Sequence, residues 1–209
     1  MKLGYSILAI SGILLIVGCG GGDATDPSAV SVDTATQTTD TQSSAVNPYP
    51  AELITDDEIT AFLKVINDAR SVEQDCGTKG VYAAAPALSW SNELYMAAYE
   101  HSNDLGVSDT FSHDGSGTDS DWTGMETGTS STVTERIENN GYTNWNKVGE
   151  NIAAGTDRDT PEEAVAAWIE SDDHCAILME PGYSEVGMAM VKNSQSTYTH
   201  YWTQDFGNR

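Results

Sequence analysis

The end of the chain alternates between two kinds of side chain. In residues 186–191 and 198–206, side chains of the same kind recur at every second position, and a short polar turn separates the two segments. Successive side chains of a β-strand point to opposite faces, so this period of two is typical of strands. Two such segments joined by a polar turn predict a β-hairpin at the end of the chain.

Three threonines mark the starts of helices in the part of the chain that precedes the hairpin. Thr55, Thr132 and Thr160 are each followed three residues later by a glutamate. This spacing is the capping box, in which the two side chains satisfy backbone N–H groups at the beginning of a helix. We therefore expect helices from residue 55 to about 72, from 132 to 141, and from 160 through Trp168.

A fourth helix is predicted to begin after Ser91 or Ser89. Its inner face carries residues at helical spacing, namely Leu94, Ala97, Ala98, His101 and Leu105. We expect His101 to be a core histidine rather than a ligand. Residues 148–154 predict a strand, and residues 114–132 predict a long loop. Helices therefore come early and strands late, which favours an α+β fold built in layers.

The first 50 residues are predicted to lie outside the folded domain. The apolar run from Ile7 to Val17 is too short for a membrane span and is typical of a signal peptide, here residues 1–18. Cys19 follows Val-Gly as in a bacterial lipobox, so we expect it to carry lipid. The alternative is a plain secretory signal with an incidental cysteine. Residues 19–50 are expected to be the lipidated cysteine and a polar tether, and residues 51–209 one domain.

The predicted anchor determines where the protein is expected to act. Lipid on Cys19 would hold the chain at the membrane after secretion across the inner membrane. Gly20 directly after that cysteine favours the outer membrane if the cell is Gram-negative. We therefore expect the domain in the cell envelope, outside the cytoplasm.

Two cysteines remain for the domain if Cys19 carries lipid. Cys76 and Cys175 are an even pair in an oxidising compartment, so we predict a disulfide between them. Two buried free thiols are the alternative. The predicted bond would close a loop of about 100 residues, which the chain-entropy model values at roughly 4–5 kcal/mol as an upper figure.

The chain is strongly acidic, with 32 Asp and Glu against 9 Lys and Arg and a net charge of −23. This balance argues against a nucleic-acid partner, because few groups could neutralise phosphates. It also disfavours docking on anionic lipid heads, so membrane attachment must come from the anchor. Most of the acidity is expected to form a solvated surface.

Three segments carry the side chains most suited to chemistry, and they are residues 111–115, 149–155 and 168–175. Glu150 lies within an otherwise small and apolar run, where a carboxylate is costly unless it is paired. His113 and His174 are its natural partners. The sequence alone does not show that the three meet.

An ordered set of motifs resembles the bacterial SCP-like extracellular branch of the CAP superfamily, which also holds cysteine-rich secretory proteins, insect venom antigens and plant pathogenesis-related proteins. The resemblance covers about residues 57–207. The matching pieces are Leu88-Ser89-Trp90, His101-Ser102-Asn103-Asp104, Phe111-Ser112-His113, Gly149-Glu150-Asn151-Ile152-Ala153, Trp168, His174-Cys175, Glu185-Val186-Gly187 and Tyr201-Trp202-Thr203-Gln204-Asp205-Phe206-Gly207.

The resemblance implies an α-β-α sandwich with a small antiparallel sheet and a surface cleft lined by histidines and glutamates. His113, Glu150 and His174 match the cleft residues and would hold a divalent cation, Zn²⁺ or Mg²⁺. Glu185 is a weaker fourth candidate. The resemblance also supports a bond between Cys76 and Cys175.

The resemblance further implies a membrane-anchored binding module, with a cation, a small ligand, a lipid or an envelope component as its partner. The alternative is a metal-dependent or serine-type hydrolase, because Ser112 and Ser171 lie near His113 and His174 in the sequence. Of the two, we expect the binding module. A structural surface protein without a ligand is a third hypothesis. One departure is Ser171-Asp172-Asp173-His174, where the bacterial pattern usually has Ser-Pro-Gly-His.

Overall fold

A computed structural model of the chain describes residues 54–209. The predicted signal peptide, Cys19, the tether and residues 51–53 of the predicted domain lie outside the described residues. Within the described part, no helix combines the length and the apolar character needed to cross a bilayer.

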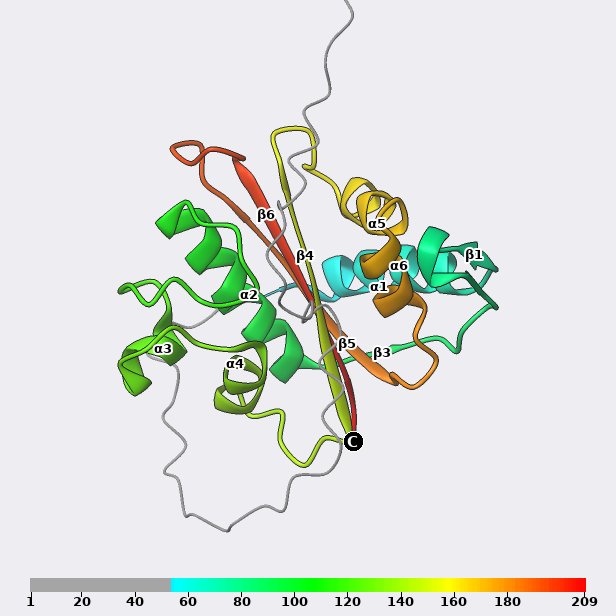
Figure 1. The fold of residues 1–209 in the computed structure, drawn as a ribbon, viewed down its shortest axis with the longest axis horizontal. Coiled ribbons are helices and arrows are strands. Elements are labelled where there is room, and N and C mark those ends of the chain that lie inside the picture. The colour runs from blue at the N-terminus through cyan, green and yellow to red at the C-terminus, as the bar shows by residue number, and fades with distance from the viewer. Residues whose placement is uncertain (1–53) are drawn as a thin grey trace, which may run out of the picture.

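A four-stranded sheet forms the centre of the domain (Figure 1). Its strand order is β3 (Ser89–Trp90), β5 (Glu185–Lys192), β6 (His200–Asn208) and β4 (Lys147–Gly155). Strands β5 and β6 form the hairpin expected from the alternating sequence, and β4 pairs with β6 in antiparallel register along its whole length. The two-residue β3 pairs parallel with β5, which is a small departure from the antiparallel sheet implied by the resemblance.

Helices cover both faces of this sheet, so the fold is the expected α-β-α sandwich of the α+β class (Figure 1). One layer contains α2 (Asn92–Ser108), α3 (Trp122–Thr127) and α4 (Val133–Asn139). The other contains α1 (Asp56–Arg70), α5 (Pro161–Ile169) and α6 (Asp172–Met179). Beside the second layer lie β1 (Gln74–Asp75), β2 (Val81–Tyr82) and the short 3-10 turn η1 (Gly77–Lys79).

The helix starts follow the capping residues found in the sequence. Thr55, Thr132 and Thr160 each form a complete capping box with the glutamate three residues later. Ser91, rather than Ser89, is the N-cap of α2 and accepts a hydrogen bond from Leu94 N. These caps satisfy N–H groups that would otherwise lack partners, so they determine where each helix begins.

The sheet divides the core into two apolar regions. The larger one joins α1, α5 and α6 to the sheet and includes Trp168, Trp202 and Phe206. On the opposite face, α2 packs so closely on β5 that a Cβ at Gly187 would overlap backbone atoms of Leu94 and Tyr95. This approach seats α2, and the loop that follows it, directly over the sheet.

The segment expected to be a long loop, residues 114–132, contains a helix. Helix α3 has an N-cap aspartate, Asp121, and ends at Gly128 in the left-handed conformation (φ 74°). Asp121 is buried and also accepts hydrogen bonds from the backbone N–H groups of Gly117 and Ser131. Asp104 of α2 accepts hydrogen bonds from the N–H and hydroxyl of Ser116. Two carboxylates therefore order a segment whose composition is that of a loop.

Candidate functional site

Glu150 lies in the middle of β4, the strand at the edge of the sheet. Val148 and Ile152, which share its face, pack against α2 and α4. Asn151 and Ala153 point to the opposite face, toward α5 and α6. Glu150 is thus placed by strand alternation under the layer of α2 and α4, at the sheet edge.

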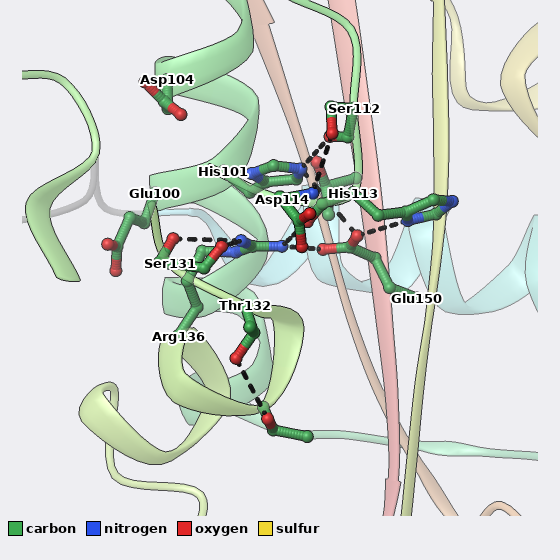
Figure 2. A network of polar contacts seen from close by, with 12 residues as sticks. Glu100, His101, Asp104, Ser112, His113, Asp114, Ser131, Thr132, Arg136 and Glu150 are labelled. Carbon is green, nitrogen blue, oxygen red and sulfur yellow. Dashed lines mark hydrogen bonds and ion pairs between the residues drawn. The ribbon is translucent and has the colours of Figure 1, made fainter. Parts of the chain in front are cut away.

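Both carboxylate oxygens of Glu150 have partners (Figure 2). His113 Nδ1 is 2.7 Å from Oε1, and Arg136 Nη2 donates to Oε2 at 2.8 Å. The same Nη2 donates to the backbone carbonyl of His113 at 2.8 Å. The Glu150 side chain is 1% exposed, whereas that of His113 is 29% exposed. Arg136 therefore holds both the buried carboxylate and the backbone of the histidine that reaches solvent.

A second carboxyl group, that of Asp205, lies beside Glu150 across the β4–β6 pairing. Burial and the charge of Glu150 raise the pKa of Asp205 well above its usual range. Burial also disfavours the charged form of Glu150, but the Arg136 guanidinium and the hydrogen bond with His113 together lower its pKa. Of the two carboxyl groups, Glu150 is therefore the anion and Asp205 the neutral acid.

His101 is buried in α2, as the sequence predicted for a core histidine. Its Nε2 lies 2.9 Å from the carbonyl oxygen of Ser112. Because a carbonyl oxygen only accepts, Nε2 carries the proton and donates this hydrogen bond. Burial, with the nearby Arg136, lowers the pKa of His101 to about 3. A neutral His101 therefore fixes the backbone immediately before His113 (Figure 2).

His174 approaches from the other helical layer. It lies in α6, and its ring centroid is 6.4 Å from that of His113. Its Nδ1 is 2.9 Å from the Ser171 hydroxyl, and its carbonyl accepts a hydrogen bond from Asn151 at 3.2 Å. Two imidazoles from opposite layers therefore meet at the edge of the sheet, beside β4.

Glu185, the weaker fourth candidate, is directed elsewhere. Its carboxylate accepts a hydrogen bond from the Tyr142 hydroxyl at 2.7 Å and is 3.4 Å from the Arg209 guanidinium. It lies on β5, which β6 separates from β4. The structure thus brings together three of the four predicted site residues and places the fourth two strands away.

Two members of the site, Arg136 and Asp205, were not predicted from the sequence. The cost of burying Glu150 indicated a partner, but the expected partners were only the histidines. Arg136 is one of just 9 Lys and Arg residues in an acidic chain. The small number of cationic candidates was the only indication in the sequence that Arg136 could pair with Glu150. Asp205 gave less indication, because its place beside Glu150 depends on the register of β4 against β6.

The described residues also bear on how a metal could bind. No group of three or more His, Cys, Asp or Glu side chains between residues 54 and 209 is arranged to hold a metal ion. The pairing of both Glu150 oxygens agrees with this, because that carboxylate is already engaged by His113 and Arg136. The His113–His174 pair is the part of the predicted ligand set that faces solvent.

A comparison with protein families identifies the family of the chain. Residues 63–206, more than half of the chain, match the model of CAP, the cysteine-rich secretory protein family. The chain belongs to the CAP superfamily. The sequence motifs around His113, Glu150 and His174 lie within the matched range.

Individual relatives of this CAP chain are distant. The uncharacterized protein YkwD of Bacillus subtilis is 36% identical over 62 residues, which are 30% of this chain and 21% of that protein. The chain therefore spans about a fifth of the length of this relative.

Solved bacterial structures are also similar to this CAP chain. An outer surface protein of Borrelia burgdorferi has a TM-score of 0.52 at 19% identity, covering 75% of this chain and 96% of that one. An extracellular SCP-domain protein of Bacillus anthracis has a TM-score of 0.49 at 20% identity, covering 75% and 45%.

Proposed function

We propose that this CAP domain is a binding module whose His113–His174 pair takes a divalent cation, Zn²⁺ in the first instance. The observation that carries the proposal is the meeting of two imidazoles from opposite helical layers, with ring centroids 6.4 Å apart. Imidazole is a common zinc ligand. The two rings come from segments far apart in the sequence that the sheet edge brings together.

The second contact of each imidazole supports this proposal. Metal-binding histidines usually direct their other ring nitrogen to a carboxylate or another oxygen, which sets the tautomer and the ring orientation. His113 Nδ1 contacts the Glu150 carboxylate, and His174 Nδ1 contacts the Ser171 hydroxyl. A cation at either ring would therefore bind Nε2. Glu150 would then position His113 rather than ligate the metal.

The charge of the chain supports a cationic ligand. A net charge of −23 attracts cations and repels anions on approach. The buried charge of Glu150 is balanced by Arg136, so the attraction comes from the acidic surface. The same charge argues against nucleic acid as a partner.

Isothermal titration of the full-length chain with Zn²⁺ tests the proposal. We expect one ion per chain in the wild type and none in the His113→Ala, His174→Ala double variant. Glu150→Gln should weaken binding by about tenfold or more, because it alters the contact that orients His113. Glu185→Gln is the matched control and should bind as the wild type does. Wild type that takes up no Zn²⁺, or a double variant that binds equally, would reject the cation site.

We further propose that the domain is held in the cell envelope by lipid on Cys19. Support comes from the signal-like run ahead of that residue and from the disulfide between Cys76 and Cys175, which is typical of an oxidising compartment. Cys19→Ser should leave the protein unprocessed or shift it from the membrane to the soluble fraction, as shown by fractionation and immunoblotting. Unchanged membrane retention and processing would contradict the anchor.

One contact favours a second candidate function, a serine-type hydrolase. The Ser171 hydroxyl lies 2.9 Å from His174 Nδ1, the reach of a nucleophile and its general base. Casein and peptidoglycan fragments are suitable substrates for the full-length chain. Turnover that disappears in Ser171→Ala and His174→Ala but persists in Ser112→Ala would establish this activity. Equal turnover in all three variants would assign it to a contaminant.

A further inference from the structure

The residues that flank His174 all attach to one segment of the chain, residues 76–79. Asp172 accepts hydrogen bonds from Thr78, through its backbone N–H at 2.8 Å and its hydroxyl at 2.5 Å. Asp173 pairs with Lys79. Cys175 is bonded to Cys76. Three of four consecutive residues of α6 are thus tied to the turn η1 and the cysteine before it.

Helix geometry explains what these attachments do to the fourth residue. At about 100° per residue, the side chains of Asp172, Asp173 and Cys175 span an arc of about 160° around the helix axis. His174 then points directly away from the centre of that arc, and its ring centroid lies 6.4 Å from that of His113. The turn η1 therefore packs against the back of α6, opposite the histidine.

The contact between η1 and α6 is close. Gly77 adopts a left-handed conformation (φ 57°), and a Cβ at this position would overlap the Asp172 carboxylate. On the other side, the His174 carbonyl is held by Asn151 of β4. The first turn of α6 is therefore fixed between the sheet edge and η1.

Ser171 makes these external links more important. It is the N-cap of α6, but its side chain makes no capping hydrogen bond to the helix backbone. Its hydroxyl contacts His174 Nδ1 instead. The Ser171 hydroxyl thus contacts the histidine instead of capping the helix. The start of α6 is attached to η1 through Asp172 and Asp173.

We propose that Asp172, Asp173 and the η1 residues Thr78 and Lys79 are positioning residues that aim His174 at His113. Only one part of the inference rests on the proposed cation function, namely the effect on the affinity of the histidine pair for Zn²⁺. The geometric part concerns the two rings and holds without any metal.

The test uses nuclear Overhauser effects between ring protons of His113 and His174 in the full-length, metal-free chain, followed by titration with Zn²⁺. The Asp172→Ala, Lys79→Ala double variant removes both non-covalent links and keeps the disulfide. We expect it to lose the inter-ring effect and to bind Zn²⁺ about tenfold more weakly. The single variant Asp172→Asn keeps Lys79, and its amide oxygen still accepts from Thr78. It should retain both the inter-ring effect and the wild-type affinity for Zn²⁺. Lys64→Ala removes the exposed ion pair with Asp68 on α1 and is the matched control.

The outcomes separate this inference from the cation site. An inter-ring effect that persists unchanged in the Asp172→Ala, Lys79→Ala variant overturns the positioning role, whatever the Zn²⁺ affinity. Loss of the effect in that variant, in a wild type that takes up no Zn²⁺, supports the positioning role and rejects the cation. Thermal melting of each variant checks that it is folded. Loss of the inter-ring effect in Lys64→Ala as well would assign that loss to general destabilisation and overturn the inference.

Discussion

Asp205 and Glu150 form a buried carboxyl pair that holds a single negative charge. Neither oxygen of Asp205 accepts a hydrogen bond from any group among residues 54–209. An ionised Asp205 would therefore be a buried anion without donors beside a second anion, which is costly. A protonated Asp205 can instead donate to Glu150. The proton on Asp205 thus lets Glu150 keep its charge for Arg136 and His113.

Replacing Asp205 by Asn should stabilise the protein at neutral pH. The raised pKa means that the folded state keeps a proton that the unfolded state releases above the usual value of 3.8. Wild-type stability therefore falls as the pH rises from that value toward the raised pKa. Asp205→Asn removes this loss and should be more stable than the wild type in urea unfolding at pH 7. A variant whose stability falls with pH as steeply as the wild type's would contradict the assignment.

His101 should give a dependence of opposite sign. Its pKa is about 3 in the folded state against 6.5 ordinarily, so between these values the unfolded state binds more protons. Stability is therefore lost as the pH falls below 6.5, by about 2–3 kcal/mol at pH 4.5 from this group. His101→Gln does not titrate and should lose less between pH 7 and pH 4.5 in urea unfolding. Equal losses in the two proteins would indicate that His101 is protonated when folded.

At the scale of elements, the sequence predicted the helices that begin with a capping box and the strands whose side chains alternate. The capping boxes at Thr55, Thr132 and Thr160 and the alternation of β5 and β6 are determined by neighbours in the chain. Helices α3 and α6 were not predicted. The first is short and is ordered by buried Asp104 and Asp121, and the second begins with Asp172 and Asp173, which are attached to η1.

The candidate site divides in the same way. His113, Glu150 and His174 were expected together from the cost of a buried carboxylate and from the family resemblance. The role of Glu150 as a partner of Arg136 could not be predicted, because α4 and β4 approach one another only in the folded domain. The pairing of Asp172 and Asp173 with η1 also could not be predicted, because it depends on the packing of η1 behind α6.

The contact between α2 and β5 is tested by Gly187→Ala. The added Cβ would meet backbone atoms of Leu94 and Tyr95, which cannot move without displacing the helix. We expect a loss of about 3 kcal/mol or more in the free energy of unfolding. Gly106→Ala, also in the α2 layer, is the control, because its Cβ would have ordinary contacts from 3.5 Å and should stabilise by up to about 1 kcal/mol. Equal stabilities of the two variants would contradict this packing.

At the scale of the whole molecule, the proposed site depends on how two helical layers are held across one sheet. His113 follows α2 in one layer, and His174 belongs to α6 in the other. Glu150 and Asn151, adjacent on β4, contact one histidine each. The edge strand therefore sets the separation of the rings, while the disulfide and η1 hold the layer of α6 to the chain that precedes the sheet.

The Cys76–Cys175 bond should be the largest single covalent contribution to the stability of the domain. Its cysteines are 99 residues apart in the sequence, so it restricts a long loop in the unfolded chain. The chain-entropy model gives roughly 4–5 kcal/mol as an upper figure, which corresponds to a melting temperature lower by about 10 °C when the bond is absent. The Cys76→Ala, Cys175→Ala double variant should show this loss in calorimetry and should not respond further to a reductant. Wild type and Cys19→Ser should both melt lower when the reductant is added. A wild-type melt that is unchanged by full reduction, confirmed by thiol titration, would show that packing alone holds η1 against α6.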